Sequence, residues 1–574
     1  MICRLWSGYP RASGGLGMTV LAAGAALVVT TLGASTQPVT ARHGMVVASE
    51  PQATAIGRDV LRLGGSAIDA AVATAFALAV TYPSAGNIGG GGFIVYRPAI
   101  GEPVTYDFRE AAPARASAEM FLVDGEYDRD RHHDSHVAVG VPGTVAGLHL
   151  AWSEYGRLPW RRLVEPAIAL AHDGFIVSHA LADSLATVLP KLARYPASMS
   201  QYSNEGVPYQ PGDRLRQPYL ARTLERIADQ GPPGFYSGRT AELVEAEMEA
   251  NGGLITQADL GTYRPQRRAP IQGTYRGHGI ISMPPSSTGG MALVQILNIL
   301  EGYDLAVSGF GSAETVHLMT EAMRRAFADR ARYVGDPDFN PAMPMALLIS
   351  KSYAEQLRAT IRIDRASASS PTSFEWPAEG QETTHVSVVD ADRQAVSLTY
   401  TLEQSYGSKI VVSGAGFLLN NEMGDFNAAP GLTDSVGLIG TEPNLAAPGK
   451  RMASSMTPTI VTKDGKLLLV TGSPGGRTII NTVLQTIVNV IDFEMNIQEA
   501  IDAPRFHHQW LPDQISYERN GLSPDTIALL ESRGHPVDVR VRQGAAQAIR
   551  YDEATDRLEG APDRRNAGST ALGY

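Results

Sequence analysis

A long apolar run after residue 69 predicts a buried helix. Residues 70–80 are almost all Ala, Val, Leu or Phe, which leaves no polar face, so this helix belongs in a core. Ser66 and Asp69 stand just before it, three residues apart, which is the spacing of a capping box. The run then passes into glycines between 86 and 92 and an apolar segment at 93–96 that predicts a strand. Glycines at such a place let two backbones approach closely.

Helical patterns dominate the next part of the chain, from 141 to about 360. The clearest of them predict helices near 145–155, 223–229, 237–251 and 313–333. From 366 to 380 the composition shifts to Ala, Ser, Pro, Thr and Glu, which is typical of a mobile or surface segment. This polar stretch ends abruptly at Thr383.

Two β-rich runs, 383–390 and 395–401, flank a polar turn. Folding them as a hairpin pairs Val389 with Ala395 and therefore Thr383 with Thr401. The two threonine side chains would then be cross-strand neighbours, with Cβ atoms about 5 Å apart. Because Thr and Val simply suit strands, this pairing by itself also fits a purely structural hairpin.

The N-terminal pattern resembles a signal peptide spanning residues 1–35. Arg4 and Arg11 precede an apolar stretch at 16–32, and small residues follow at 33–35. A retained membrane anchor is the competing interpretation, but polar and glycine interruptions shorten the apolar stretch. We therefore expect an exported protein, periplasmic or secreted, with the leader removed.

Composition narrows the classes of function. The chain has 574 residues, 44% of them hydrophobic, with 48 basic and 59 acidic side chains and a net charge of −11. A substantial core is expected, and the acidic balance argues against nucleic acid as a partner. Cys3 is the single cysteine and lies in the leader, so neither a disulfide nor a thiolate metal cluster is expected.

Several ordered motifs resemble those of the γ-glutamyltranspeptidase family of N-terminal nucleophile (Ntn) hydrolases. They are TTH at 383–385, LLNNEMGDF at 418–426, SSMTPT at 454–459, GSPGG at 472–476 and DFRE at 107–110. The resemblance covers nearly all of the sequence after the leader. It implies an α/β fold, a four-layer αββα sandwich.

The resemblance also implies a precursor that cuts itself between Glu382 and Thr383. A large subunit, 36–382, and a small subunit, 383–574, would remain associated as one intertwined domain. A threonine hydroxyl is a weak nucleophile until a base takes its proton, and cleavage frees an α-amine on Thr383 that can do so. In the family, the position of Thr401 orients this hydroxyl, in agreement with the hairpin pairing.

The family also implies how a γ-glutamyl donor such as glutathione is held. Arg109, Ser454 and Ser455 suit its α-carboxylate. Glutamate and aspartate side chains suit the α-ammonium: they are Glu403, Glu422 and Asp425. Gly475 and Gly476 would offer backbone N–H groups to the developing oxyanion. The expected partners are thus the donor and an amino-acid or peptide acceptor.

Two positions depart from the family pattern. Many members have asparagine where this chain has Glu403, and a third carboxylate beside Glu422 and Asp425 adds repulsion unless a cation relieves it. The segment 430–440 matches a lid loop, in which Val436 replaces a gating tyrosine. We therefore expect looser closure and leave the balance between hydrolysis and transfer open.

Histidines suggest a metal site in two places. His507 and His508 are adjacent and, in a strand, would point to opposite faces, so we expect them to be structural. The cluster from His132 to His136 is the better metal candidate, although a solvated loop is favoured. No metal or other cofactor is expected.

Two other functions stay open. A glutaryl-type β-lactam (cephalosporin) acylase would use the same machinery on another substrate, although Arg109, Ser454 and Asp425 favour a zwitterionic glutamyl group. An exported binding protein that never cleaves itself is the alternative outside enzymes.

Overall fold

The computed structural model describes residues 36–369, 383–431, 441–540 and 542–574. Its compact unit runs from Gln37 to Tyr574. Among the described residues, no helix combines the length and the apolar character needed to cross a bilayer. The leader, the proposed cleavage partner Glu382 and the lid position Val436 lie outside the described residues.

Two seven-stranded antiparallel sheets form the centre of the fold. The first has the order β21 (Thr570–Gly573), β2 (Met45–Ala48), β12 (Thr384–Val389), β13 (Ala395–Thr401), β3 (Gly91–Arg97), β4 (Val104–Phe108) and β9 (Gln266–Arg268). The second has the order β1 (Val39–Ala41), β20 (Arg557–Pro562), β19 (Gln547–Asp552), β15 (Lys466–Gly472), β14 (Thr459–Lys463), β11 (His278–Ser282) and β10 (Ile271–Tyr275). Side chains such as Phe93, Val389 and Ile460 fill the space between the two sheets.

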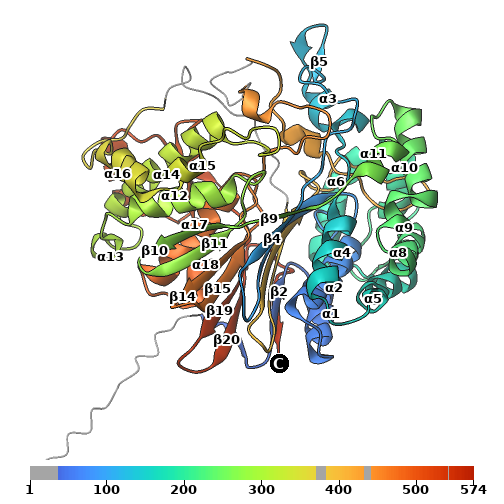
Figure 1. The fold of residues 1–574 in the computed structure, drawn as a ribbon, viewed down its shortest axis with the longest axis horizontal. Coiled ribbons are helices and arrows are strands. Elements are labelled where there is room, and N and C mark those ends of the chain that lie inside the picture. Colours follow the sequence, from blue (N-terminus) through green and yellow to red (C-terminus); the bar gives the residue numbers. More distant parts are fainter. Residues whose placement is uncertain (1–35, 370–382, 432–440, 541) are drawn as a thin grey trace, which may run out of the picture. The chain divides into compact units, whose positions relative to one another are not determined.

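Helices cover both outer faces (Figure 1). The first sheet packs against α1 (Pro51–Arg62), α2 (Ala67–Thr81) and α4 (Thr144–Tyr155), while α5 (Trp160–Asp173) packs on α2 and α8 (Pro218–Gln230) packs on α5. The second packs against α12 (Gly289–Leu300), α14 (Ala313–Tyr333), α17 (Thr478–Ile491) and α18 (Ile497–Asp502). The result is the expected four-layer αββα sandwich.

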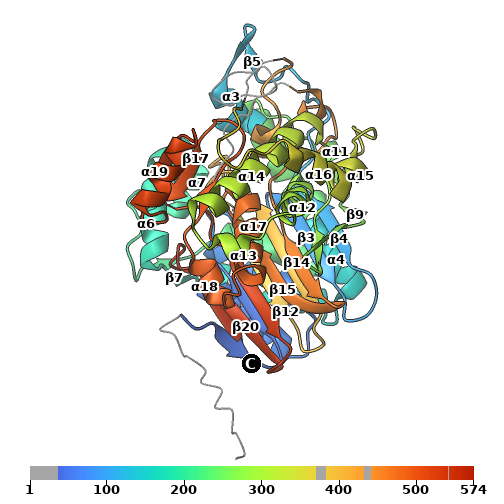
Figure 2. The same ribbon diagram turned by 90° about the vertical axis from the view of Figure 1, so that its left-hand side faces the viewer.

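Smaller elements surround these layers (Figure 2). The helices are α3 (Arg129–His133), α6 (His179–Leu192), α7 (Pro196–Tyr202), α9 (Pro233–Tyr236), α10 (Gly238–Asn251), α11 (Gln257–Thr262), α13 (Leu305–Ser308), α15 (Met345–Leu348), α16 (Lys351–Ala359) and α19 (Pro524–Ser532). The strands are β5 (Leu122–Val123), β6 (Glu126–Tyr127), β7 (Phe175–Ile176), β8 (Arg214–Leu215), β16 (Phe506–His507), β17 (Ile515–Glu518) and β18 (Val537–Arg540).

Local sequence signals account for much of this arrangement. The Ser66 hydroxyl accepts from the Asp69 backbone N–H and caps α2, and the Asp69 carboxylate accepts from the Ser66 backbone N–H, so the predicted capping box is confirmed. Every residue of α2 is buried, as its uniformly apolar sequence predicts. The stretch from 141 to 360 is mostly helical, but β9, β10 and β11 also lie there and complete edges of the two sheets.

Each of the two sheets contains strands from before and from after Thr383. In the first sheet, β12 and β13 lie between β2 and β3, and β21 pairs with the other edge of β2. In the same region, the backbone N–H groups of Arg42 and His43 donate to the Tyr574 carbonyl at 3.1 and 2.8 Å. The two parts of the chain are therefore interwoven.

Candidate active site

The β12–β13 hairpin brings two threonine hydroxyls together. Its register pairs Val389 with Ala395 and Thr384 with Tyr400, which confirms the predicted pairing. Thr383 immediately precedes β12, and its Oγ1 lies 3.4 Å from Oγ1 of Thr401. The backbone N–H of Glu403 donates to the same Thr401 oxygen at 2.9 Å. Both threonines are buried, at 5% and 3% exposure.

The glycine run allows strand β3 to start close against this hairpin. A Cβ on Gly90 would lie 2.0 Å from the Thr401 carbonyl oxygen, and one on Gly91 would lie 2.6 Å from Oε2 of Glu110. Asn87 fixes the approach, since its Nδ2 donates to the Thr401 carbonyl at 2.8 Å and its Oδ1 accepts from Gly90 N at 2.9 Å. Side chains larger than hydrogen would push Thr401 away from Thr383.

One small pocket collects nearly all the predicted site residues. Its lining contains Arg109, Thr383, Thr401, Glu403, Glu422, Asp425, Ser454, Ser455 and Gly476, together with Met456 and Ile479. Of the predicted site residues that the structure describes, Gly475 alone does not line it. The residues predicted to form the site, which come from segments far apart in the sequence, therefore lie around Thr383.

Arg109 is fully buried and pairs with acidic neighbours in this pocket. Its Nη1 contacts Glu422, its Nη2 contacts Asp425, and Oε2 of Glu110 lies 3.7 Å away. Burial opposes the charge, but these carboxylates outweigh it and raise the pKa of Arg109 above its usual value. Burial raises the pKa of Glu110 to about 8, and that of Glu422 is also raised. The sequence predicted separate substrate contacts for Arg109 and for Glu422 and Asp425, whereas in the structure Arg109 pairs with both acids.

Glu403 lies apart from this ion pair. Its carboxylate is 4% exposed, and neither oxygen has a hydrogen-bond partner among the described residues. His133 approaches it, with Nδ1 3.3 Å from Oε1 of Glu403. Glu403 is therefore approached by a histidine about 270 residues earlier in the chain, a contact that sequence reasoning missed.

A second buried arginine, Arg330, holds the segment of Ser454 and Ser455 in place. Nη2 of Arg330, on α14, donates to Oγ of Ser455 at 2.8 Å, and its Nε contacts Thr288. The Ser454 carbonyl accepts from the Thr288 backbone N–H at 2.7 Å. Arg330 was not predicted, although an arginine on the apolar side of a helix is an unusual sequence feature.

Gly475 and Gly476 form the turn between β15 and α17. Their φ angles are 132° and 55°, conformations that favour glycine. Both carbonyls accept from the first turn of α17, from Thr478 N and Ile479 N at 3.1 Å each. Among the described residues, nothing accepts a hydrogen bond from either glycine N–H. These groups are available to bind an anion at the start of the helix.

The histidine cluster of α3 differs from the sequence expectation. His132, His133 and His136 are buried, so the prediction of a solvated loop is wrong. The reason is packing: the His132 ring lies on Phe121, with centroids 3.9 Å apart, and His136 Nε2 lies 3.1 Å from Glu247. His507 instead contacts Asn481 and Gln509, and His508 contacts Asp513.

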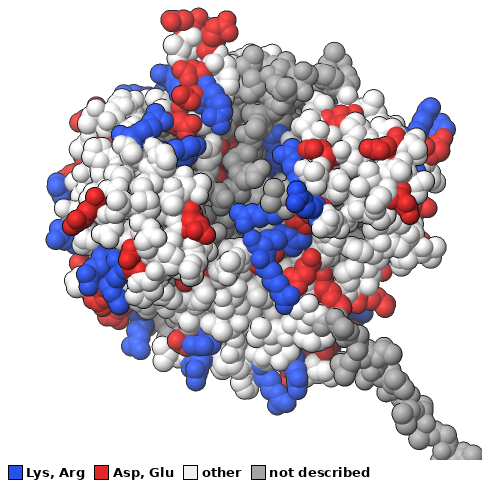
Figure 3. Space-filling model, turned by 180° about the vertical axis from the view of Figure 1, so that it is seen from behind, with Lys and Arg blue, Asp and Glu red and all other residues white. Residues whose placement is uncertain are grey.

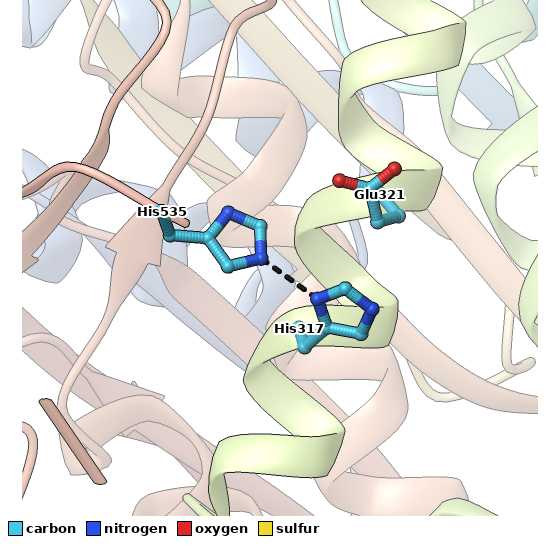
Figure 4. Close-up of side chains that lie close together, drawn as sticks. All are labelled: His317, Glu321 and His535. Atoms are coloured by element: carbon cyan, nitrogen blue, oxygen red, sulfur yellow. Dashed lines mark hydrogen bonds between the residues drawn. The ribbon is translucent and has the colours of Figure 1, made fainter. Parts of the chain in front are cut away.

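A different cluster has the donor atoms of a metal site. His317, Glu321 and His535 converge within the core, and His317 Nδ1 lies 2.7 Å from His535 Nε2 (Figure 4). His317 Nε2 lies 2.7 Å from the Arg362 carbonyl, which can only accept, so His317 Nδ1 is left to accept from His535.

Glu321 already pairs with two arginines in this cluster. Its carboxylate contacts Arg324 at 3.2 Å and Arg325 at 2.7 Å, and accepts from the Ser367 backbone N–H at 3.1 Å. A divalent cation would have to displace or face two guanidinium groups. These guanidinium groups instead contact Ser369 and Ser367, which lie in residues 366–369, the part of the predicted polar stretch that the structure describes.

The layers and the threonine at the head of a central strand define an Ntn hydrolase. The sequence profile of the gamma-glutamyltranspeptidase family matches residues 53–573. The chain belongs to this family.

Individual relatives agree with that assignment. A glutathione hydrolase proenzyme of Escherichia coli (strain K12) is 49% identical over 545 residues, covering 94% of this chain and 93% of the relative. An acylase ACY 1 proenzyme of Pseudomonas sp. (strain V22) is 41% identical, covering 87% and 88%. The crystal structure of cephalosporin acylase from Bacillus halodurans superposes with a TM-score of 0.83 at 28% identity, covering 95% of this chain and 98% of that one.

Proposed function

We propose that this chain is a self-processing γ-glutamyltransferase and glutathione hydrolase. The observation that carries the proposal is the pocket in which Thr383 and Thr401 meet Arg109 and an acidic cluster. The naming of a 49% identical relative as a glutathione hydrolase proenzyme supports both the activity and the processing.

Processing starts with attack of Thr383 Oγ1 on the carbonyl carbon of Glu382. The peptide nitrogen leaves as the α-amine of Thr383, and an ester to Oγ1 forms in its place. Water then cleaves the ester, which restores the hydroxyl and gives residues 36–382 a free carboxylate. The new α-amine is the base that later activates Thr383.

In the mature enzyme, the donor's α-carboxylate binds Arg109, Ser454 and Ser455. Its α-ammonium binds Glu403, Glu422 and Asp425. For this, Arg109 gives up part of its contact with Glu422 and Asp425 and binds the donor carboxylate instead. The donor ammonium then supplies the positive charge that these two acids lose. A zwitterionic glutamyl group therefore leaves the buried charges of the pocket balanced.

Thr383 Oγ1 then attacks the γ-carbonyl of the donor. The N–H groups of Gly475 and Gly476 stabilise the oxyanion, the α-amine carries the proton to the leaving nitrogen, and the C–N bond breaks. Water or an acceptor amine then attacks the γ-glutamyl ester. The attacking group gives a proton to Thr383 Oγ1, and the γ-glutamyl product leaves. No cofactor is required by these steps.

The alternative function, a β-lactam acylase, is supported by relatives that are named acylases, but these are less similar to this chain than the glutathione hydrolase relative. Arg109, Asp425 and Glu403 argue against it, because a glutaryl group brings no ammonium to the acids. Comparing γ-glutamyl and glutaryl anilides separates the two: we expect a kcat/KM ratio above about 100 in favour of γ-glutamyl, since one charge-assisted hydrogen-bond set of about 3 kcal/mol is lost. Equal turnover would reject the glutamyl role of the acidic cluster.

Processing has its own test. Denaturing electrophoresis should give two bands, with Thr383 as the first residue of the smaller one. Thr383→Ala should stay uncleaved and inactive, whereas the matched variant Thr384→Ala should still cleave. A wild-type chain that remains single would favour the non-cleaving binding protein instead.

Export is part of the proposal and rests on the sequence of residues 1–35. The expected signature is a large subunit that begins near residue 36 when purified from the periplasm or medium. Recovery of full-length leader in a membrane fraction would instead support the anchor.

A further inference from the structure

One acid of the candidate active site, Glu403, is partnered differently from the others. Arg109 contacts Glu422 and Asp425. Glu403 is also buried, but neither of its carboxylate oxygens has a hydrogen-bond partner among the described residues. Nδ1 of His133 lies 3.3 Å from Oε1 of Glu403 and is likewise buried without a hydrogen bond within the described ranges. A buried carboxylate is costly unless a positive charge faces it, so the protonation state of His133 bears on whatever Glu403 binds.

Residues beside the pocket hold His133 against Glu403. Helix α3 packs on the turn at 422–425, and Asn421 Nδ2 donates to the His133 carbonyl at 2.9 Å. Gly424 leaves space for the ring, because a Cβ at this position would lie 2.4 Å from His133 Nδ1 and 3.1 Å from Oε1 of Glu403. A larger side chain at position 424 would therefore force the imidazole and the carboxylate apart.

The neighbouring ring, His132, uses both of its nitrogens in hydrogen bonds. Its Nε2 lies 3.2 Å from the Met423 carbonyl, which only accepts, so this nitrogen carries the proton. Nδ1 then accepts from the Tyr127 hydroxyl, 3.0 Å away. Burial lowers the pKa of His132 well below its ordinary value, and a charge on His133 lowers it further. A proton taken up by this pair of rings therefore goes to His133.

The charged groups around the His133–Glu403 pair have partners of their own. Lys409 acts on Glu403 through space, but its Nζ lies 3.6 Å from Asp134. Arg129, on the outer side of α3, pairs with Asp134 at 3.4 Å and is 64% exposed, so water screens its charge. Figure 3 shows side chains of both signs on the end of the molecule formed by β5, β6 and α3, at the top of the view. Beneath this charged surface, His133 is the group that contacts the buried carboxylate.

We propose that His133 determines how strongly the pocket selects donors that carry an α-ammonium. This inference rests on the proposed γ-glutamyl function, and it makes His133 a positioning residue, because His133 acts through Glu403. When His133 is neutral, the Glu403 carboxylate is left for the donor ammonium. When His133 is protonated, the imidazolium supplies the positive charge itself, so the ammonium gains less and a donor without one no longer leaves Glu403 unpaired. Since imidazole groups change charge between about pH 5 and 8, selectivity should fall as the pH falls.

The test uses two donors that differ only in the α-ammonium, γ-glutamyl-p-nitroanilide and glutaryl-p-nitroanilide. The ratio of their kcat/KM values cancels the effects of pH on Thr383 and on the leaving group, which both donors share. In the wild-type enzyme we expect this ratio to fall at least five-fold between pH 8 and pH 5.5. The change should lie in KM, because His133 does not touch the reacting atoms.

Three variants show which group causes the change. Glutamine in His133→Gln still donates to Glu403 and gains no proton, so the ratio should stay within two-fold between the two pH values, although Glu110 and Glu422 titrate as before. Glu403→Gln should give a lower ratio that is also independent of pH. His136→Gln is the matched control, because His136 is buried and pairs with Glu247 at 3.1 Å but does not line the pocket; it should keep the wild-type pH dependence. The yield of processed protein reports the folding of each variant.

Two results would overturn this inference and leave the proposed function intact. One is a wild-type ratio that does not change with pH, and the other is an equal change in His133→Gln and in the wild-type enzyme. A wild-type protein that hydrolyses neither donor would refute the proposed function, and this inference with it.

Discussion

Replacing Arg109 by Met tests the buried charges of the pocket directly. Methionine retains much of the aliphatic volume and removes the cation, which leaves Glu110, Glu422 and Asp425 close together without it. The Arg109 side chain is completely buried, so solvent does not screen the loss. Removing one member of a buried ion pair costs about 3–5 kcal/mol, and we expect this loss in the free energy of unfolding at pH 8.

The size of the loss should depend on pH. A buried carboxyl group with a raised pKa contributes stability below its unfolded pKa of about 4.5 and loses that contribution as the pH rises through its folded pKa, which is about 8 for Glu110. Without Arg109 the folded-state pKa values of Glu110 and Glu422 rise further. The destabilisation at pH 5.5 should therefore be smaller than at pH 8 by at least about 1.4 kcal/mol, the equivalent of one pKa unit.

Urea unfolding at 25 °C measures both quantities. The comparison is best made with Thr383→Ala in every protein, because an uncleaved chain removes dissociation of two subunits from the measurement. Arg109→Lys is the matched control, since it keeps the charge and should lose less stability with little pH dependence. An equal loss in the free energy of unfolding at pH 5.5 and pH 8, or a loss below about 1 kcal/mol at pH 8, would refute the stabilising role of Arg109 in the buried ion pairs.

Two other predictions concern the hairpin and acid stability. Gly90→Ala should cost about 1–3 kcal/mol by overpacking and reduce activity at least ten-fold, because its Cβ would displace Thr401; Gly261→Ala, with open space around it, should change neither thermal stability nor kcat. Burial lowers the pKa of His508 to about 4 and of His535 to about 3, so their contribution to stability is complete above pH 6.5 and is lost as the pH falls toward those values. Melting temperatures recorded between pH 7 and pH 4 should fall steadily, and a constant value would contradict the burial of these rings.

The sequence predicts local structure well wherever a short pattern determines it. The capping box at Ser66 and the hairpin register around Asp392 follow from a few neighbouring residues, and both are confirmed. Strands β10 and β11 were missed because they are short, rich in glycine and embedded among helices. They pair with each other, and β11 also pairs with β14, which comes much later in the chain.

Site composition was easier to predict than the contacts within the site. Motifs indicated Arg109 and Glu422 as site residues, but no pattern shows which charges pair when no ligand is bound. The contact between His133 and Glu403 joins positions about 270 residues apart, and it depends on the packing of α3 against the turn at 422–425. The buried histidines were wrongly expected in a loop for the same reason: their polarity is visible in the sequence, and the aromatic surface that covers them is not.

Tyr574 lies beside Arg42 and His43, and this contact would allow the order of the two parts of the chain on either side of Thr383 to be reversed. Because Tyr574 bonds to Arg42 and His43, a linker of about eight residues would reach back along β1 to Gln37. A rearranged gene could then encode Thr383 first, continue through Tyr574 and the linker, and finish with the segment that now precedes the threonine. Removal of the initiator methionine would expose the threonine amine, so translation itself would deliver the proposed nucleophile without the proposed cleavage step.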